Sequence, residues 1–324
     1  MADLPPSRVN PSRAFLHVGI DFAGPFPMRE SQRRKAAVPK AYLCVFVCMA
    51  TKAVHLEIVS ALSTDAFLAA LNRFIGRRGL PEHCYSDCGT NFQGAANKLR
   101  EFGSWYREQS TQEDILHQAT KFEIKWNFNP PSAPHFGGLW EAAVKSAKTL
   151  LRRVAGDTPL TYEELTTWFV RIEAVLNSRP LCPLSSSPEE TEFLSPGHFL
   201  IGTSLLATPE PSLLDTKVSS LSRWQLLLRM TQHFWQRWRV EYLTFLQKRN
   251  KWTKNYENAK VGDLVLLKEP NAPVLQWPLA RITHVHPGED GIVRVLTVKC
   301  GRSELRRPAV KVVPLLPLHT SHLD

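Results

Sequence analysis

The order of strand-like and helix-like segments over residues 15–177 most restricts what this chain can fold into. Three apolar, strand-like segments come first, at 15–26, 41–50 and 52–59, and the short link between the last two predicts a hairpin. A helix follows at 63–79, because Ser and Thr precede apolar residues at helical spacing and two glycines close the segment. The chain therefore begins with a three-stranded meander and one helix.

The segments that follow alternate between strand and helix. We expect a strand at 80–85, a helix at about 95–107, a strand at 121–128, and helices at about 139–154 and 162–177. A meander followed by such alternation predicts an α/β fold with a mixed sheet and flanking helices, which is the element order of a ribonuclease-H-like fold. We expect this core at 15–180, after a lead-in at 1–14.

The last part of the chain has a different pattern. Residues 181–220 are rich in Pro, Ser and Thr, which predicts loops and a linker. Within 221–318, a long amphipathic helix precedes four or five short strands, the pattern of a small SH3-like β-barrel. An aromatic stripe along this helix favours a packing seam over a base-stacking platform. Its members are Trp224, Leu228, Trp235, Trp238, Tyr242 and Phe245.

Charge is unevenly distributed between these regions. From Arg223 onward the chain has 17 Lys and Arg against 8 Asp and Glu, whereas the first 222 residues have 23 against 22. An excess of positive charge confined to an appended module indicates a polyanion such as nucleic acid as its partner. A solvated basic face and a protein partner are the alternatives.

Several other classes of protein are disfavoured. No apolar run is long enough to cross a membrane, and the N-terminus lacks the apolar core of a signal peptide. Six cysteines in 324 residues do not suggest a disulfide framework. The pairs Cys44/Cys48 and Cys84/Cys88 lack accompanying histidines at zinc-ligand spacing, so buried reduced thiols are favoured over a zinc site.

Three acidic residues are candidates for catalysis. Asp21 interrupts the first strand, Asp87 ends the fourth, and Glu141 lies in the first turn of the helix after Gly137-Gly138. Each has an ordinary alternative, as an edge-strand surface residue, a turn or cap residue, and a favourable charge at a helix N-terminus. If the sheet brings them together, their mutual repulsion calls for cations, and two Mg²⁺ ions, or Mn²⁺, would suit carboxylates.

Three blocks of sequence carry a family resemblance. The segments "HVGIDFAGPF", "SDCGTNFQGA" and "PPSAPHFGGLWEAAVKSAK" resemble the catalytic blocks of retroelement integrases, most closely those of BEL/Pao-type LTR retrotransposons. The "RWQ" helix and the strands after it resemble the C-terminal region of that class. The resemblance implies that Asp21, Asp87 and Glu141 bind two divalent metal ions. The implied activity is 3′-end processing of element DNA and its strand transfer into target DNA.

The resemblance also implies DNA-binding residues. Lys145 and Lys148 lie four and seven residues after Glu141, on the same helix face, where related integrases contact the DNA end. An ordinary Glu–Lys pair within the helix is the alternative. The other predicted DNA-binding residues are Arg152, Arg281, Arg294, Lys299, Arg306 and Arg307. Asn91 and His135 either line the same cleft or have structural roles.

The chain departs from the retroviral pattern in two ways. Fifty-three residues separate Asp87 from Glu141, a longer spacing than the familiar one, and the zinc domain that normally precedes the core is not in the sequence. We therefore expect an internal piece of a longer Pao polyprotein, acting in the nucleus as a homo-oligomer on DNA without a membrane partner. An inactive transposon-derived protein that binds DNA or chromatin is the main alternative, and a ribonuclease acting on RNA–DNA hybrids is a third.

Overall fold

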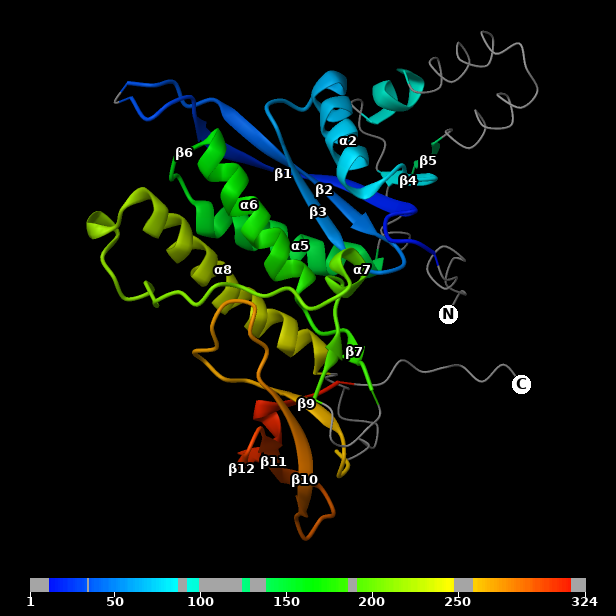
Figure 1. The fold of residues 1–324 in the computed structure, drawn as a ribbon, viewed down its shortest axis with the longest axis vertical. Coiled ribbons are helices and arrows are strands. Elements are labelled where there is room, and N and C mark those ends of the chain that lie inside the picture. Colours follow the sequence, from blue (N-terminus) through cyan, green and yellow to red (C-terminus); the bar gives the residue numbers. More distant parts are fainter. Residues whose placement is uncertain are drawn as a thin grey trace, which may run out of the picture. The chain divides into compact units, whose positions relative to one another are not determined.

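Figure 1 shows the computed structural model of the chain, which divides into two compact units, Met1–Leu176 and Asn177–Asp324. The structure describes residues 12–33, 35–86, 92–98, 124–128, 138–185, 191–247 and 259–315, with side chains in the helix at 138–155 described from Ser146 onward. Within these ranges, no helix combines the length and apolar character needed to cross a bilayer.

The first unit is built on a six-stranded mixed sheet (Figure 1). Five strands follow the order β3-β2-β1-β4-β5; β1, β2 and β3 form an antiparallel meander, whereas β4 and β5 run parallel to β1. A short sixth strand pairs in parallel with the end of β1. The strands are β1 (His17–Arg29), β2 (Lys40–Cys48), β3 (Val54–Val59), β4 (His83–Ser86), β5 (Lys125–Phe128) and β6 (Leu160–Thr161). This arrangement confirms the predicted mixed α/β sheet.

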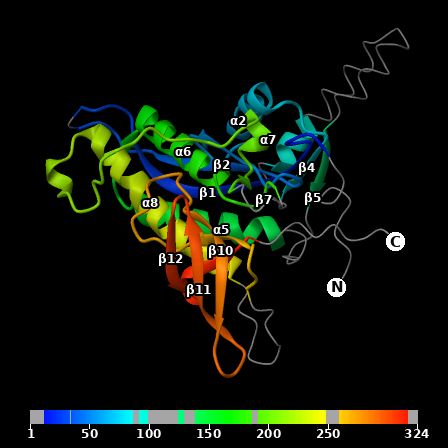
Figure 2. The same cartoon turned by 60° about the horizontal axis from the view of Figure 1, so that its bottom comes forward.

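Helices cover both faces of this sheet. All six residues of β3 and nearly all of β2 are buried, although neighbouring side chains in a strand point to opposite faces. Figure 2 shows the reason, since α2 (Thr64–Arg78) and α5 (Gly138–Ala155) lie on opposite sides of the strands. The near-continuous apolar sequence of β2 is therefore the mark of a strand buried on two sides.

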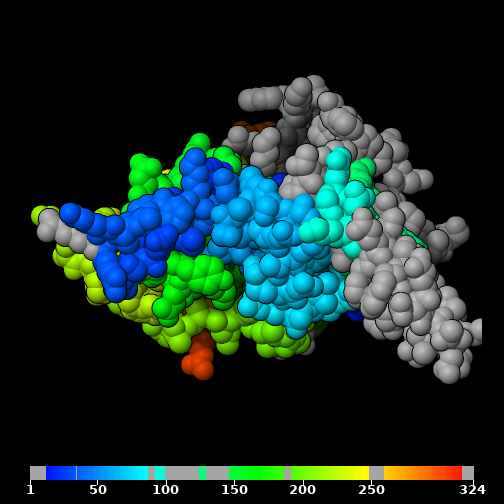
Figure 3. Space-filling view, turned by 90° about the horizontal axis from the view of Figure 1, so that it is seen from above, coloured from blue at the N-terminus to red at the C-terminus, as the bar shows by residue number. Residues whose placement is uncertain are grey.

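The helix α2 begins and ends where its sequence predicts. The Ser63 hydroxyl accepts the backbone N–H of Ala66 at 3.3 Å, and Gly79 ends the helix with a φ of 86°. Phe67, Leu71 and Phe74 face the core, while the opposite side forms part of the surface seen in Figure 3 (sky blue). This separation is the amphipathic pattern that the spacing predicts.

The outer edge of β3 is capped by the last long helix of the unit, α6 (Tyr162–Asn177). The backbone N–H of Leu56 points away from β2 and donates to Oε2 of Glu173 at 2.9 Å. An unpaired strand edge is a site for unwanted strand addition. The Glu173 carboxylate satisfies one edge donor and thereby attaches α6 to the sheet.

The second unit contains a long helix and a five-stranded antiparallel sheet. The helix is α8 (Arg223–Leu246), whose first turn is closed by a capping box between Ser222 and Gln225. The strands follow the order β12-β11-β10-β9-β13 around a core that includes Val265, Ile282 and Val298. They are β9 (Leu264–Leu267), β10 (Leu279–Pro287), β11 (Val293–Cys300), β12 (Ser303–Pro308) and β13 (Val312–Pro314). Closure of this sheet into a barrel stays a prediction.

The aromatic stripe of α8 packs against the connection between β9 and β10. The Trp277 ring makes T-shaped contacts with Trp235, Trp238 and Tyr242 at centroid distances of 4.9, 6.0 and 5.6 Å. The Trp235 indole N–H donates to the Ala272 carbonyl at 2.8 Å. The middle of the stripe is therefore a packing seam.

Two sequence expectations for this unit need correction. Trp224 and Phe245, at the ends of the stripe, are 57% and 68% exposed, because the Trp277 contacts involve only the middle of α8. The segment 181–220 is also more than a linker. It forms the hairpin β7 (Cys182–Pro183) and β8 (Phe193–Leu194), the short helix α7 (His198–Ile201) and the 3-10 turn η3 (Val218–Ser220).

Candidate active site

Asp21 lies on β1, the central strand of the first unit. Its neighbours Ile20 and Ala23 are buried, whereas 38% of the Asp21 side chain is exposed. Oδ1 of Asp21 accepts the backbone N–H of Phe22 at 2.6 Å. The carboxylate therefore reaches the surface from a partly buried strand and is held in place by the backbone next to it.

Lys148, from α5, provides a positive charge at this carboxylate. Its Nζ donates to Oδ2 of Asp21, forming an ion pair in which the lysine side chain is only 16% exposed. A half-buried carboxylate is costly to desolvate unless a partner compensates its charge. The structure thus brings together two of the predicted site residues, one from the sheet and one from the helix that packs against β1.

The strand β4, which precedes the predicted acid Asp87 in the sequence, pairs in parallel with β1. The register pairs His17 with His83 and Gly19 with Tyr85. Asp21 follows Gly19 by two residues, and Asp87 follows Tyr85 by two, but Asp87 itself lies outside the described residues. The end of β4 is held by Ser86, whose hydroxyl accepts the Trp126 indole N–H at 2.9 Å.

The third predicted acid belongs to α5. The backbone at position 141 is helical, seven residues or about two turns before Lys148, which places both positions on the same helix face. The side chains of Glu141 and Lys145 lie outside the described part, as do Asn91 and His135 altogether. Arg152 is exposed in the last turn of α5.

An aromatic cluster lies directly behind Asp21. The ring of Phe22 stacks on Phe92 at 5.2 Å, and Phe67 meets Phe92 and Trp126 edge to face at 5.0 and 5.8 Å. These rings come from β1, α2, the helical segment 92–98 and β5. Because aromatic packing is dense and directional, the cluster fixes the part of β1 around Asp21.

Basic residues of the second unit share one face of its sheet. The register places Arg281 opposite Lys299, and Thr297 opposite Arg306, so these side chains project from the same side of β10, β11 and β12. Lys299 and Arg306 are exposed. The Arg281 guanidinium also donates to the Gly262 carbonyl at 2.6 Å. The face also carries the exposed Glu304, opposite Lys299, and its three cations leave it net positive.

The other two predicted DNA-binding residues of this unit have acidic neighbours. Arg294 forms a two-bond ion pair with Asp290 at 2.8 and 2.6 Å, which lowers the pKa of Asp290 to about 2. Arg307 lies opposite Leu296 in the register and 3.5 Å from the carboxylate of Glu269. Both guanidinium groups already have anionic partners within the chain.

A buried charge cluster in the first unit was not predicted from the sequence. His55 lies between Glu57 and Glu173, and the arginines of α2 complete the ion pairs. All three central residues are buried. A signal was present in "AVHLEIV", where a histidine and a glutamate two residues apart interrupt an apolar strand and so share one face. The partner on α6 could not be read from that pattern.

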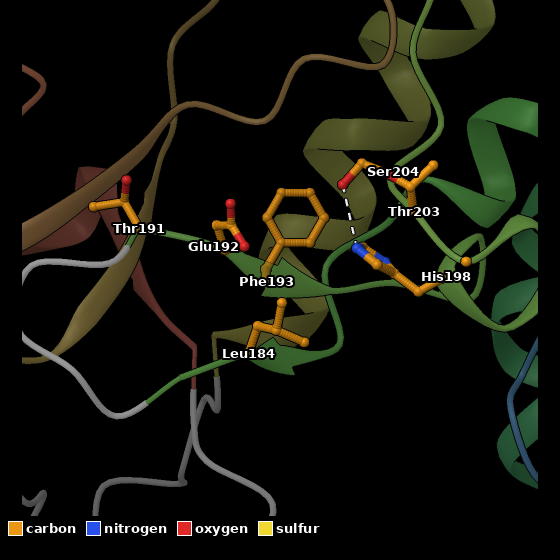
Figure 4. A pocket seen from close by; sticks show the side chains of 8 residues that line it. Leu184, Thr191, Glu192, Phe193, His198, Thr203 and Ser204 are labelled. Atoms are coloured by element: carbon orange, nitrogen blue, oxygen red, sulfur yellow. Dashed lines mark hydrogen bonds between the residues drawn. The ribbon is translucent and has the colours of Figure 1, made fainter.

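A cavity of about 330 Å³ lies beside the β7–β8 hairpin (Figure 4). Its lining consists of Leu184, Thr191, Glu192, Phe193, His198, Gly202, Thr203 and Ser204. The backbone N–H of Ser195 donates to Nδ1 of His198 at 3.0 Å, so the proton of the neutral ring is on Nε2 and is donated to the Ser204 hydroxyl, 3.3 Å away. This ring cannot accept the Ser204 proton, and the pair is not a nucleophile with its base.

The donor set around Asp21 is compatible with a divalent cation. A carboxylate that already holds an ammonium group shows that the position attracts positive charge, and carboxylate oxygen is a preferred ligand of Mg²⁺. Among the described side chains, no three His, Cys, Asp or Glu residues gather at one point. The side chains of Asp87 and Glu141 lie outside this part of the chain.

Comparison with known proteins gives one family match and distant structural similarities. Residues 222–315 match a family described as "Family of unknown function (DUF5641)". No curated protein matches the chain.

Two of the solved structures to which the chain is similar come from retroviruses. A chain of the simian T-cell lymphotropic virus intasome in complex with PP2A regulatory subunit B56 gamma is similar over 98% of this chain and 84% of its own, with 14% identity and a TM-score of 0.35. The HTLV-2 integrase catalytic core domain in complex with magnesium, in a trimeric form, is similar over 52% of this chain and 89% of its own, with 18% identity and a TM-score of 0.31. At these scores, the similarity by itself establishes neither a shared fold nor a shared activity.

Proposed function

We propose that this chain is the catalytic core and C-terminal region of a BEL/Pao-type LTR retrotransposon integrase. The observation that carries the proposal is the position of Asp21, an acid on the central strand of a β3-β2-β1-β4-β5 sheet with a cation already at its carboxylate. The same strand order supports a ribonuclease-H-like core. The three sequence blocks that resemble integrases contain Asp21, Asp87 and Glu141.

The proposed chemistry is the processing and transfer of DNA 3′ ends. Divalent metal ions held by the three acids would supply activation of the attacking hydroxyl and neutralisation of charge at the leaving oxygen. In this proposal Asp21 provides a carboxylate fixed by the Phe22 amide, and Lys148 provides an ammonium group for a DNA phosphate beside it. The basic face of the second unit would hold DNA through phosphate contacts. The protein would act as a homo-oligomer in the nucleus.

A strand-transfer assay with the terminal repeats of the element tests this function. Asp21→Asn keeps the size of the side chain but removes its charge and replaces one acceptor oxygen by an NH2 donor. We expect it to lower strand transfer by at least about a hundredfold in Mg²⁺, the scale for losing a group that stabilises transition-state charge. Asp65→Asn is the matched control, because Asp65 is an exposed acid on α2 that pairs with Lys98. Equal activity of Asp21→Asn and the wild type would reject the proposal.

A second candidate is a DNA-binding protein without catalytic activity. The exposed basic face of β11 and β12 is the observation that favours it. Such a protein would bind duplex DNA equally well with Mg²⁺ or with a chelator, and would yield no strand-transfer product in either condition. A ribonuclease would instead cut an RNA–DNA hybrid and leave duplex DNA intact.

A further inference from the structure

Both carboxylate oxygens of Asp21 are engaged within the chain. Oδ1 accepts the Phe22 amide at 2.6 Å, and Oδ2 accepts the Lys148 ammonium. The amide is part of β1 and cannot move away without breaking the strand. The ammonium stands at the end of a flexible four-carbon side chain and can move. A cation that binds Asp21 must therefore compete with Lys148 for Oδ2.

We propose that Lys148 is a built-in counter-ion that divalent metal displaces from Asp21, so that metal binding frees the lysine to bind a DNA phosphate. The inference rests on the function proposed above. A divalent ion coordinated about 2 Å from Oδ2 would lie only a few ångströms from the ammonium. Two charges of the same sign so close repel strongly in a partly buried site, and the mobile one leaves.

The helix offers a place for the released side chain. Lys148 is followed four residues later by Arg152, which is exposed on the same side of α5. An ammonium released from Asp21 would join this guanidinium, and two cations one turn apart suit the phosphates of a DNA backbone. The sequence already predicts DNA binding by both residues. The ion pair adds a reason why Lys148 would do so only when metal is bound.

The proposal makes metal and DNA cooperative ligands. If metal frees Lys148 for DNA, then DNA that holds Lys148 must by reciprocity raise the affinity for metal by the same factor, typically about 5- to 150-fold for coupled sites. Mg²⁺ ordinarily weakens the binding of proteins to DNA, because it competes for the phosphates. An increase in DNA affinity with Mg²⁺ is therefore a distinctive expectation.

The test uses the full chain, Mn²⁺ titrated by electron paramagnetic resonance, and duplex DNA titrated by fluorescence anisotropy at constant ionic strength. Lys148→Met removes the competing charge, and we expect it to bind Mn²⁺ about tenfold more tightly than the wild type. Mg²⁺ should raise the DNA affinity of the wild type and not that of Lys148→Met. Lys148→Arg keeps the charge and should bind Mn²⁺ no more tightly than the wild type. Arg153→Met, an exposed cation on another face of α5, is the control.

The outcomes distinguish failure of this inference from failure of the proposed integrase function. Equal Mn²⁺ affinity of Lys148→Met and the wild type, with binding still lost in Asp21→Asn, overturns the inference and leaves the integrase proposal intact. Tighter Mn²⁺ binding by Lys148→Met without strand transfer by the wild type supports the inference and rejects the integrase. Absence of Asp21-dependent Mn²⁺ binding in the wild type rejects both. Circular dichroism of each variant identifies any that fails to fold, and Lys148→Gln, which also removes the charge, then replaces Lys148→Met.

Discussion

His55 is the residue whose surroundings most clearly define its charge. Its Nε2 lies 3.1 Å from Glu57, and its Nδ1 lies 3.2 Å from Glu173, so both ring nitrogens face carboxylates. Burial by itself would lower the pKa of His55, but the carboxylates of Glu173 and Glu57, which accept hydrogen bonds from the ring, outweigh burial and raise it, against the opposing charge of Arg78. These contacts favour the protonated form of the buried ring, which joins β3 to α6.

This environment makes part of the stability depend on pH. A raised pKa in the folded state means that His55 stabilises the fold fully below its unfolded pKa of about 6.5, and that this contribution is lost as pH rises through the folded value. His55→Gln should therefore be less stable than the wild type by about 2 kcal/mol at about pH 5.5 and by less at about pH 9. Urea unfolding followed by circular dichroism measures both differences.

The control is His284→Gln, which removes an exposed ring from the second unit. A difference between wild type and His55→Gln that stayed constant over this range, or that changed equally in the control variant, would contradict an imidazolium at position 55. The comparison with the wild type also cancels His17, whose pKa is lowered by burial and by the nearby His83.

Protonation of Glu57 is expected to lower the stability of the fold at acidic pH. Burial would raise the pKa of Glu57, but the hydrogen bonds from His55 and Arg73 outweigh it and lower the pKa. Its contribution is therefore present above the unfolded pKa of about 4.3 and is lost as pH falls through the folded value. In the wild type, the urea midpoint of unfolding should fall as the pH is lowered. Glu57→Gln should make this fall smaller, whereas Glu304→Gln, at an exposed position, should leave it unchanged. An unchanged fall in Glu57→Gln would mean that this carboxylate is not ionised in the fold.

The sequence identified Asp21 as a candidate site residue, but it did not reveal the contacts made by Lys148 and Glu173. Asp21 could be singled out because an acid within an apolar strand calls for compensation, and its exposed carboxylate with a cation fits that expectation. The partnership with Lys148 was not predictable, because it joins residues 127 positions apart. Glu173 was likewise hidden, since an acid on an amphipathic helix usually faces solvent.

At the scale of elements, the seam between α8 and the β9–β10 connection is where we expect a single substitution to lower stability most. Trp277→Ala removes one ring that contacts three others and also the hydrogen bond from its indole to the Ser178 hydroxyl at 3.2 Å. We expect a loss of about 3–5 kcal/mol in the free energy of unfolding, as for other buried tryptophans. Urea denaturation reports the change.

The same helix supplies the matched control. Trp224→Ala removes an equally large ring from an exposed position in the first turn of α8 and should change stability by about 0.5 kcal/mol or less. Comparable losses in the two variants would show that the stripe as a whole, and not its contact with Trp277, holds the second unit together.

Helices and strands were more predictable from the sequence than their partners. The helix expected at 162–177 is α6 with the same bounds, because its apolar spacing and its ends are local features. The exposure of Trp224 and Phe245 was not predictable, since helical spacing reports a face but not how far along the helix its partner extends. The hairpin β7–β8 was missed because two-residue strands give no periodicity.

At the scale of the whole molecule, the positive excess is concentrated from Arg223 onward, where 17 Lys and Arg stand against 8 Asp and Glu. Within this region Lys299 and Arg306 are exposed on one face of the sheet. Lys299→Gln with Arg306→Gln should weaken duplex DNA binding and reduce the slope of log K against log salt concentration by about 0.9 for each DNA phosphate that the variant no longer neutralises. Fluorescence anisotropy over a range of salt concentrations measures the slope.

The matched variant changes the same number of charges elsewhere. Arg33→Gln with Lys35→Gln removes two exposed cations from the connection between β1 and β2. If this variant lowered the salt slope as much as the first, DNA affinity would follow net charge alone and not the sheet of the second unit.

The order of the first sheet was partly predictable. Three consecutive strands without a helix between them, the last two joined by a short link, indicate a meander, and the helices between later strands allow parallel pairing. The sequence could not specify that β4 pairs with β1, since that contact joins segments more than sixty residues apart. Barrel closure in the second unit depends on pairing of the same long-range kind.

One consequence follows from the Glu173 carboxylate at the edge of β3. A foreign strand approaching there meets a helix that belongs to the same molecule and an amide that is already occupied. Addition of a strand at this margin would first have to displace the Glu173 carboxylate from the Leu56 amide. The contact that attaches α6 therefore also opposes self-association through β3.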